Sequence, residues 1–237
     1  MKRLEGKAAI ITGGTGGLGK AVMSELLSQG AYVLSTYLDD RELEDLGEIR
    51  DGYKTKVAFG KADVTKVSHV SNMALKAAEK FSRIDILVNV VGGFSQSHIT
   101  ETDEDAWDKM MDMNLKSAFL CSKSVIPHMM KQGRGSIVNI ASRPALKGSP
   151  GLSAYGASKA GVLNLTQSLA EELKEHNINV NAVIPGTMDT PGNRRSMPDA
   201  DFTKWVPPHD VAKVIAFLCS EDARAVSGAA IPVYGKS

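Results

Sequence analysis

Residues 12–19 read Thr-Gly-Gly-Thr-Gly-Gly-Leu-Gly, and this stretch decides the fold class. It lies between a short apolar run and an apolar helical segment, and it holds five of the chain's 22 glycines. A glycine-rich turn lets the backbone approach a ligand closely, and the N–H groups at a helix N-terminus favour a phosphate. The stretch therefore predicts a phosphate-binding loop, with a glycine turn that binds nothing as the competing interpretation.

The spacing of these glycines separates the loop from two better-known phosphate loops. The interval from Gly13 to Gly17 is wider than the first interval of the G-x-G-x-x-G pattern, although Gly19 follows at a short distance. No Gly-Lys-Ser/Thr sequence ends the loop, so it is not a nucleoside-triphosphate P-loop. The position of the loop after the first strand still indicates a dinucleotide.

Short apolar runs alternate with amphipathic segments along the rest of the chain. Helical spacing of apolar residues marks 67–81 and 154–175. Strands that alternate with helices pair in parallel through right-handed crossovers. The predicted fold class is thus α/β, a doubly wound parallel seven-stranded sheet of Rossmann type with helices on both faces. The expected strands are 8–11, 31–34, 56–59, 84–88, 136–140, 178–184 and 230–233.

Length and charge exclude several classes of protein. At roughly 150 residues per domain the 237 residues allow one domain or two, and the absence of a linker favours a single domain over 1–237. The 28 basic residues nearly cancel the 27 acidic ones, so no basic excess favours nucleic acid or an anionic membrane. No apolar run reaches the roughly 18 residues of a membrane span. A soluble cytoplasmic protein is expected.

The cysteines and histidines do not form a recognisable site. Cys121 and Cys219 each follow a Phe-Leu pair, which favours core packing, and two cysteines cannot build a disulfide framework. The five histidines lie too far apart for metal-ligand spacing, and no metal is predicted. They are His69, His98, His128, His176 and His209.

Three residues in the second half of the chain suggest catalysis. Lys159 follows Tyr155 by four residues, which places both on one face of a helix. A nearby ammonium favours the phenolate and would let the tyrosine exchange a proton near neutral pH. Ser142 follows the strand 136–140, at the carboxyl edge where doubly wound sheets bind ligands. The competing interpretations are an exposed tyrosine–lysine pair on a helix and a serine that serves only as a turn or cap residue.

The end of the second strand bears on the choice of cofactor. An acidic residue there selects NAD and a basic one selects NADP, but Tyr37 and Leu38 occupy the two informative positions. Asp39 and Asp40 would repel a 2′-phosphate, and the glycine loop carries no cation, so NAD is favoured over NADP. The acidic pair is equally well explained as the N-cap of the next helical segment.

Together these residues resemble the short-chain dehydrogenase/reductase family over nearly the whole chain. The family loop T-G-x-x-x-G-x-G matches Thr12 to Gly19, and its serine, tyrosine and lysine match at family spacing. The resemblance implies a catalytic group of Asn114, Ser142, Tyr155 and Lys159. It implies cofactor contacts from Gly13, Thr15, Gly17, Leu18, Gly19, Tyr37, Asp63, Val64, Asn89, Gly92, Tyr155, Lys159, Pro185, Gly186, Thr187 and Met188.

The roles of these residues follow from the resemblance. Tyr155 is expected to act as the general acid or base, Lys159 to hold the nicotinamide ribose and lower the phenol pKa, and Ser142 to bind the substrate oxygen. Asn114 is expected to support a water that links Lys159 to solvent. One motif departs from the family, because N-N-A-G appears here as Asn-Val-Val-Gly at 89–92. This puts local hydrogen bonding near the cofactor ribose in question.

The expected activity is NAD(P)-dependent interconversion of a secondary alcohol and a ketone. A 3-oxoacyl-thioester (carrier-protein) reductase is the alternative within the family, and a cofactor-binding regulator on the same fold is the non-enzyme alternative. Arg143 and the pair at 194–195 could meet an anionic substrate, although solvated surface is the favoured interpretation. The resemblance also suggests a homotetramer or homodimer built on helices at 103–131 and 153–176 and on the C-terminal segment. The span 187–206, which carries Pro191, Gly192 and Pro198, is expected to form a short substrate lid.

Overall fold

Strand β1 (Ala8–Thr12) is buried along its whole length, because the sheet around it is covered on both faces. The structure is a computed structural model that describes residues 2–236. Its seven-stranded sheet is entirely parallel, in the order β3-β2-β1-β4-β5-β6-β7, which confirms the predicted fold class. The other strands are β2 (Tyr32–Tyr37), β3 (Val57–Lys61), β4 (Ile86–Asn89), β5 (Gly135–Ile140), β6 (Ile178–Pro185) and β7 (Ala230–Val233).

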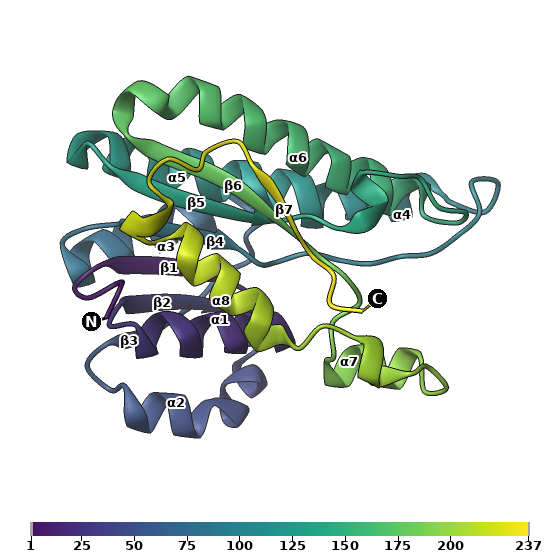
Figure 1. The fold of residues 1–237 in the computed structure, drawn as a ribbon, viewed down its shortest axis with the longest axis horizontal. Helices are drawn as coiled ribbons and strands as arrows, with labels where there is room; N and C mark the ends of the chain where they lie inside the picture. The colour runs from purple at the N-terminus through teal and green to yellow at the C-terminus, as the bar shows by residue number, and fades with distance from the viewer. Residues whose placement is uncertain (1, 237) are drawn as a thin grey trace.

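Helices cover the sheet in two layers, with α1 (Gly17–Ser28) and α8 (Pro208–Leu218) against each other on one face and α3 (Val67–Phe81) beside α5 (Ser117–Gln132) on the other (Figure 1). Each layer has its own hydrophobic core. The remaining α-helices are α2 (Gly47–Gly52), α4 (Glu104–Met110), α6 (Ser153–Leu173) and α7 (Pro191–Ser196). None of the helices within residues 2–236 is long and apolar enough to cross a membrane.

The predicted periodicity is correct for α3, which occupies 67–81 and turns Val70, Met73, Ala74 and Ala77 inward. The segment 103–131 is less regular than one long helix. It divides into α4, a π-helical stretch η2 (Met111–Lys116) and α5. Single π-helical turns inside α-helices often mark functional positions, and this one carries Asn114.

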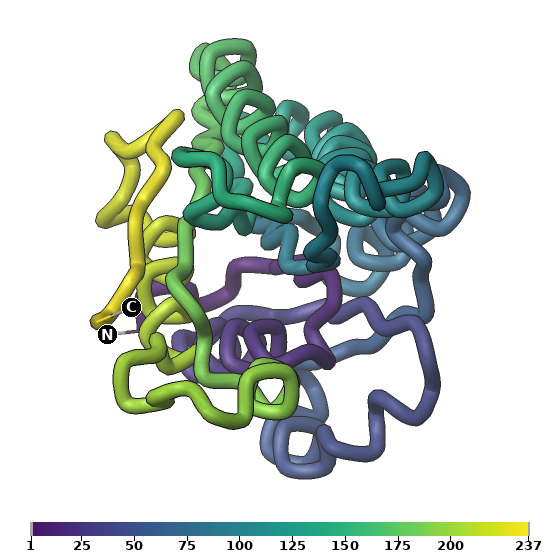
Figure 2. The backbone as a smooth tube through the Cα atoms, turned by 90° about the vertical axis from the view of Figure 1, so that its right-hand side faces the viewer, coloured from purple at the N-terminus to yellow at the C-terminus, as the bar shows by residue number. Residues whose placement is uncertain are grey.

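The strand order reverses direction between β1 and β4, whose last residues Thr12 and Asn89 pair. Chain segments that leave the carboxyl ends of these two strands diverge to opposite faces and leave a crevice between them. Figure 2 looks onto the end of the molecule where α7 lies, with the 187–206 segment below and the chain after β4 above. The glycine loop and residues 90–92 therefore meet at one edge of the sheet.

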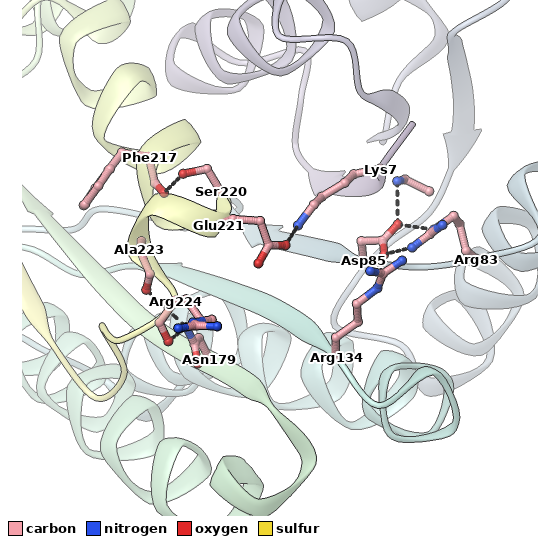
Figure 3. Close-up of polar contacts among 11 residues, drawn as sticks. Lys7, Arg83, Asp85, Arg134, Asn179, Phe217, Ser220, Glu221, Ala223 and Arg224 are labelled. Carbon is pink, nitrogen blue, oxygen red and sulfur yellow. Dashed lines mark hydrogen bonds and ion pairs between the residues drawn. The ribbon is translucent and has the colours of Figure 1, made fainter. Parts of the chain in front are cut away.

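A charged network closes the opposite, amino-terminal edge of the sheet (Figure 3). The buried carboxylate of Asp85 accepts hydrogen bonds from the Ala8 backbone N–H at 2.9 Å and from Arg83 at 2.6 and 2.5 Å. Arg134 pairs with the same carboxylate at 3.8 Å, and Lys7 pairs with Glu221 at 2.7 Å. These bonds tie β1 to the start of β4, far from the crevice.

We expect Asp85→Ala to lower the free energy of unfolding by about 2 to 4 kcal/mol, because it leaves a buried N–H and a partly buried guanidinium without an acceptor. Urea denaturation of both proteins measures the change. Asp222→Ala is the matched control, since Asp222 pairs with Arg3 in the open, with both side chains more than half exposed; its cost should stay below about 0.5 kcal/mol. Equal losses in the two variants would contradict this prediction.

Candidate active site

A cavity of about 860 Å³ opens at the carboxyl edge, above β1 and β4. Its walls come from the glycine loop, the ends of β2 and β3, residues 90–92, the π-helical stretch and the segment after β6. Ten of the predicted cofactor contacts line it, namely Gly13, Thr15, Gly17, Leu18, Gly19, Tyr37, Asp63, Val64, Gly92 and Met188. The tertiary structure thus brings together residues that lie up to 175 positions apart in the chain.

Four of the five loop glycines have no room for a side chain, and Gly16 is the exception. A Cβ on Gly13 would lie 2.9 Å from the Val91 side chain, and one on Gly19 would lie 2.1 Å from the Gly13 carbonyl oxygen. The Gly13 N–H donates to the Thr36 hydroxyl at 3.0 Å. Helix α1 begins at this loop with Gly16 as its N-cap and no side-chain cap. Its first N–H groups are therefore left for a ligand, as an anion site requires.

The predicted catalytic residues gather beside this cavity rather than in its wall. Lys159 and Asn114 flank Gly92, because a Cβ added there would lie 3.1 Å from Lys159 Nζ and 2.7 Å from Asn114 Oδ1. Asn114 is held on both sides: its Oδ1 accepts from the Gly93 N–H at 3.0 Å, and its Nδ2 donates to the Ser158 hydroxyl at 3.0 Å. The Asn114 side chain is therefore fixed next to the ammonium.

Lys159 is buried and has no acidic partner among the described residues. Its Nζ donates to the Ile140 carbonyl oxygen at 2.8 Å, and only 5% of the residue is exposed. Burial lowers the pKa of Lys159 to about 8. A buried ammonium without a carboxylate is costly, and such groups gather at functional sites.

This burial predicts an unusual pH dependence of stability for the protein without added cofactor. Because the folded pKa of Lys159 lies below its ordinary value of 10.5, the unfolded chain binds more protons between about pH 8 and pH 10.5. The Lys159 contribution to the free energy of unfolding is therefore smallest at low pH and rises through that interval.

We expect the wild-type chain to gain on the order of 1 to 3 kcal/mol relative to Lys159→Met between pH 8 and pH 10. Denaturant titrations of both proteins at several pH values measure the difference. Burial raises the pKa values of Cys121 and Cys219 to about 12, which acts in the opposite direction, but equally in both proteins. Parallel curves for the two proteins would contradict the assigned Lys159 pKa.

Tyr155 lies one helical turn before Lys159 on α6, and its side chain hydrogen-bonds that of Ser142. Burial raises the pKa of the phenol, and the Ser142 hydrogen bond lowers it in part. The Lys159 ammonium donates to the Ile140 carbonyl oxygen, and burial is the larger of the two effects on the pKa of the phenol. The phenol is therefore protonated at neutral pH, which suits a proton donor.

The two valines of the 89–92 motif do not disturb the backbone around them. The N–H groups of Val90 and Val91 donate to the Thr12 hydroxyl at 3.0 and 3.2 Å. Their side chains pack on the two opposite cores of the sheet, and both residues line the cavity. The departure from the family motif thus makes this part of the wall more apolar and leaves its backbone hydrogen-bonded.

Some predicted cofactor contacts lie outside the cavity wall. Asn89 is buried below it, where its amide donates to the Asn139 side chain at 2.8 Å and to the Ser122 hydroxyl at 3.3 Å. The Asn89 Oδ1 is left without a partner. Pro185 ends β6, and the next residues Gly186 and Thr187 bond through their backbones to Val233 and Val206.

The acidic pair at 39–40 also lies outside the cavity wall. Asp39 is the N-cap of the 3-10 helix η1 (Asp40–Leu46) and pairs with Arg41 at 2.5 Å, which confirms the capping interpretation. Asp40 pairs with Lys61 at 2.6 Å. Both carboxylates are thus matched by cations, and neither lines the cavity.

Among the residues near the site that had no individual prediction, Glu42 and Phe94 matter most. Glu42, on η1, lines the cavity and bonds to the Thr15 hydroxyl. Its signal in the sequence was the Asp39-x-x-Glu42 capping box. Phe94, in the loop after β4, is 65% exposed and stands edge-on to the Tyr155 ring with centroids 5.1 Å apart. A single exposed phenylalanine carries no signal of its own, so only the fold could place it there.

Two further groups of predicted residues can be placed. Arg143 stacks on the Tyr234 ring at 4.6 Å, whereas Arg194 pairs with Asp189 at 2.5 Å. The cysteines are both buried and free, which confirms that they pack in the core. Within residues 2–236, no three His, Cys, Asp or Glu side chains lie close enough together to hold a metal ion.

Comparison with known proteins agrees with this arrangement. A family model described as short chain dehydrogenase matches residues 7–201. The chain belongs to the short-chain dehydrogenase family. Like other members of that family it is an oxidoreductase, and membership implies that it binds NAD or NADP and acts on a small molecule.

Individual relatives of this short-chain dehydrogenase span nearly its whole length. A 3-oxoacyl-acyl-carrier-protein reductase of Thermotoga maritima is 36% identical over 98% of both chains. A 2-(R)-hydroxypropyl-CoM dehydrogenase of Xanthobacter autotrophicus is 35% identical over 97% of both. The solved structure of a short-chain dehydrogenase/reductase variant from Serratia marcescens covers 99% of this chain and 98% of its own, at 30% identity and a TM-score of 0.90.

Proposed function

We propose that this chain is an NAD-dependent oxidoreductase that interconverts a secondary alcohol and a ketone. The observation that supports it best is the buried ammonium of Lys159, which has no acidic partner and lies beside a glycine-walled cavity. The hydroxyls of a ribose would supply further uncharged oxygen acceptors beside the Ile140 carbonyl, to which the ammonium already donates. A dinucleotide bound along the cavity would stabilise Lys159 in its charged form.

The residues around the cavity fit a nicotinamide dinucleotide. The uncapped N-terminus of α1 suits the diphosphate. The end of β3 suits the adenine, because the Asp63 carboxylate is held in place by the Thr65 N–H and hydroxyl at 3.0 and 2.7 Å. Lys159 suits the nicotinamide ribose. When bound, the nicotinamide ring supplies or accepts the hydride.

Tyr155 transfers the proton that accompanies the hydride. In the reducing direction its phenol donates a proton to the ketone oxygen, and in the oxidising direction the phenolate removes one from the alcohol. Ser142 hydrogen-bonds the same phenol and holds the substrate oxygen beside it. Asn114 keeps Lys159 in position from the π-helical side. The phenol and the serine hydroxyl thus define the place of the reacting oxygen.

The apolar ring of Phe94 against Tyr155 suggests an uncharged apolar group next to the reacting carbon. We also propose that the segment 187–206 acts as a short lid over the substrate, because it supplies Met188, Thr190 and Asn193 to the cavity wall. A single catalytic domain then carries the whole reaction. Its two buried free cysteines suit a reducing, cytoplasmic compartment.

The reduction of 3-oxoacyl thioesters is the second candidate function. It rests on the 36% identity to the Thermotoga maritima reductase over nearly the whole chain. A 3-oxo group is a ketone, so the same tyrosine and serine would serve it. The two candidates differ in the part of the substrate beyond the reacting carbon.

A panel of ketones, secondary alcohols and 3-oxoacyl thioesters, each with NAD(H) or NADP(H), tests both candidates through the absorbance of the reduced nicotinamide. We expect turnover of simple ketones or alcohols with NAD(H). Preferential turnover of the thioesters would favour the second candidate. Tight cofactor binding without turnover of any substrate would favour a regulator on the same fold and overturn the proposal.

We further propose that the protein assembles as a homotetramer or homodimer through the helices at 103–131 and 153–176. Trp107 on α4 and Phe119 on α5 are 37% and 44% exposed, which is costly for large apolar side chains in an isolated chain. Light scattering measures the assembly, and a monomer at micromolar concentration would contradict it.

A further inference from the structure

The carboxylate of Glu42 is held at the cavity wall by three donors. Its Oε1 accepts from the backbone N–H of Asp39 at 2.9 Å and of Leu38 at 3.4 Å. Its Oε2 accepts from the Thr15 hydroxyl in the glycine loop. Thr15, Leu38 and Glu42 all line the cavity. The carboxylate therefore bridges the glycine loop and the end of β2, and it cannot turn away without breaking these bonds.

Glu42 is also the uncompensated charge of this corner. Its acidic neighbours Asp39, Asp40 and Asp45 all pair with cations and do not line the cavity. Glu44 is exposed to solvent and does not line the cavity either. Among the described residues no basic side chain pairs with Glu42. The cavity does have one lysine in its wall, Lys109, but this residue comes from α4, whereas Glu42 packs on the glycine loop.

We propose that Glu42 makes the protein selective for a dinucleotide with an unphosphorylated adenosine ribose. This inference rests on the proposed dinucleotide site. The end of β2 is the place where doubly wound folds read the ribose 2′ position. A fixed carboxylate there repels a 2′-phosphate, and partial burial strengthens the repulsion compared with that in water. A neutral ribose hydroxyl carries no such cost and can donate to a carboxylate oxygen.

Glu42, rather than Asp39 or Asp40, is then the residue responsible for the preference for NAD. From the sequence, Asp39 and Asp40 were the residues expected to repel a 2′-phosphate. In the structure Asp39 pairs with Arg41 and Asp40 pairs with Lys61. Glu42 also caps a helix, because its side chain completes the capping box of η1. Capping needs only an acceptor oxygen, which a glutamine also provides. The charge of Glu42 is therefore not needed for the helix, and the two roles can be separated.

Glu42→Gln tests the charge alone. The glutamine oxygen can still accept from the Asp39 N–H, and its amide can donate to the Thr15 hydroxyl, so the local fold is retained. Glu44→Gln is the matched control, because Glu44 lies on the same helix, is exposed and does not line the cavity. Isothermal titration calorimetry of the full chain with NAD⁺ and with NADP⁺ gives the dissociation constants, and thermal denaturation verifies that each variant is folded.

We expect the wild-type chain to bind NAD⁺ at least about tenfold more tightly than NADP⁺. In Glu42→Gln the dissociation constant for NADP⁺ should fall by at least about tenfold, while that for NAD⁺ changes by less than about threefold. Glu44→Gln should leave the ratio of the two constants unchanged.

An unchanged ratio in folded Glu42→Gln would overturn the inference, and so would an equal change in Glu44→Gln, which would indicate only the general field of the surface. Equal binding of both dinucleotides by the wild-type chain would overturn it as well, but would leave the dinucleotide site standing. Failure of the wild-type chain to bind either dinucleotide would instead remove the proposed function together with the inference.

Discussion

Tyr155→Phe lowers kcat by about 1,000-fold or more and leaves the affinity for NAD almost unchanged. The phenol hydroxyl is the group that holds the transferable proton, and general acid–base catalysis of this kind contributes roughly 100- to 10,000-fold. The ring itself remains, so the edge-on contact with Phe94 is retained. Steady-state kinetics on the best substrate of the panel and calorimetry with NAD⁺ measure the two quantities.

Tyr53→Phe is the control for this substitution, because Tyr53 follows α2 and does not line the cavity. Its kcat should stay within about twofold of the wild-type value. If Tyr155→Phe kept more than a tenth of the wild-type kcat, the proton donor would have to be another group. If instead Tyr155→Phe lost NAD binding, its effect would be structural rather than catalytic.

Gly92→Ala should have the second large effect, and it should weaken cofactor binding as well as lower the turnover rate. Its Cβ would lie 2.7 Å from Asn114 Oδ1 and 3.1 Å from Lys159 Nζ. The closer contact is with Asn114, whose amide Gly93 and Ser158 hold, so relieving it breaks these hydrogen bonds and also disturbs the ammonium next to Asn114. A displacement of about 1 Å at a reacting centre can cost about 100-fold in rate. We expect at least that loss in kcat/KM.

A glycine-to-alanine substitution outside the site should leave the activity unchanged. Gly47 begins α2 with helical backbone angles, and a Cβ added there meets no atom within 4 Å. Gly47→Ala should therefore leave kcat/KM within about twofold of wild type. A Gly92→Ala protein with the same activity as Gly47→Ala would show that Lys159 does not need its observed position for catalysis.

Most of the fold could be predicted because its signals are local. The alternation of apolar runs and amphipathic segments predicts all seven strands to within a few residues, and the apolar stripe of α3 predicts that helix over its full length. The π-helical stretch at 111–116 could not be predicted this way. A π-turn differs from an α-turn by one residue, and what retains it here is the packing of Asn114 against Gly93 and Ser158, which lie far away in the sequence.

The site residues likewise fall into those that local spacing predicts and those that only tertiary contacts place. The glycine loop and the Tyr155–Lys159 pair have a spacing that can be recognised within one segment. The place of Asn89 could not be inferred, since its partners Ser122 and Asn139 come from other elements and draw it below the cavity floor. The sequence also could not predict that the pKa of Tyr155 is raised, because this shift depends on how deeply the phenol is buried.

Local patterns alone thus determined an α/β dinucleotide fold and the residues around which its chemistry would gather, since helix and strand periods and glycine turns depend on near neighbours. Folding decided which charges remain free. Five carboxylates follow β2 within residues 39–45, at positions 39, 40, 42, 44 and 45, and nothing in their local sequence distinguishes the one that faces the cavity. Only the approach of Lys61, Lys20 and the glycine loop leaves Glu42 alone at the cavity wall. Electrostatic effects depend on distance in space, which the order of residues does not contain.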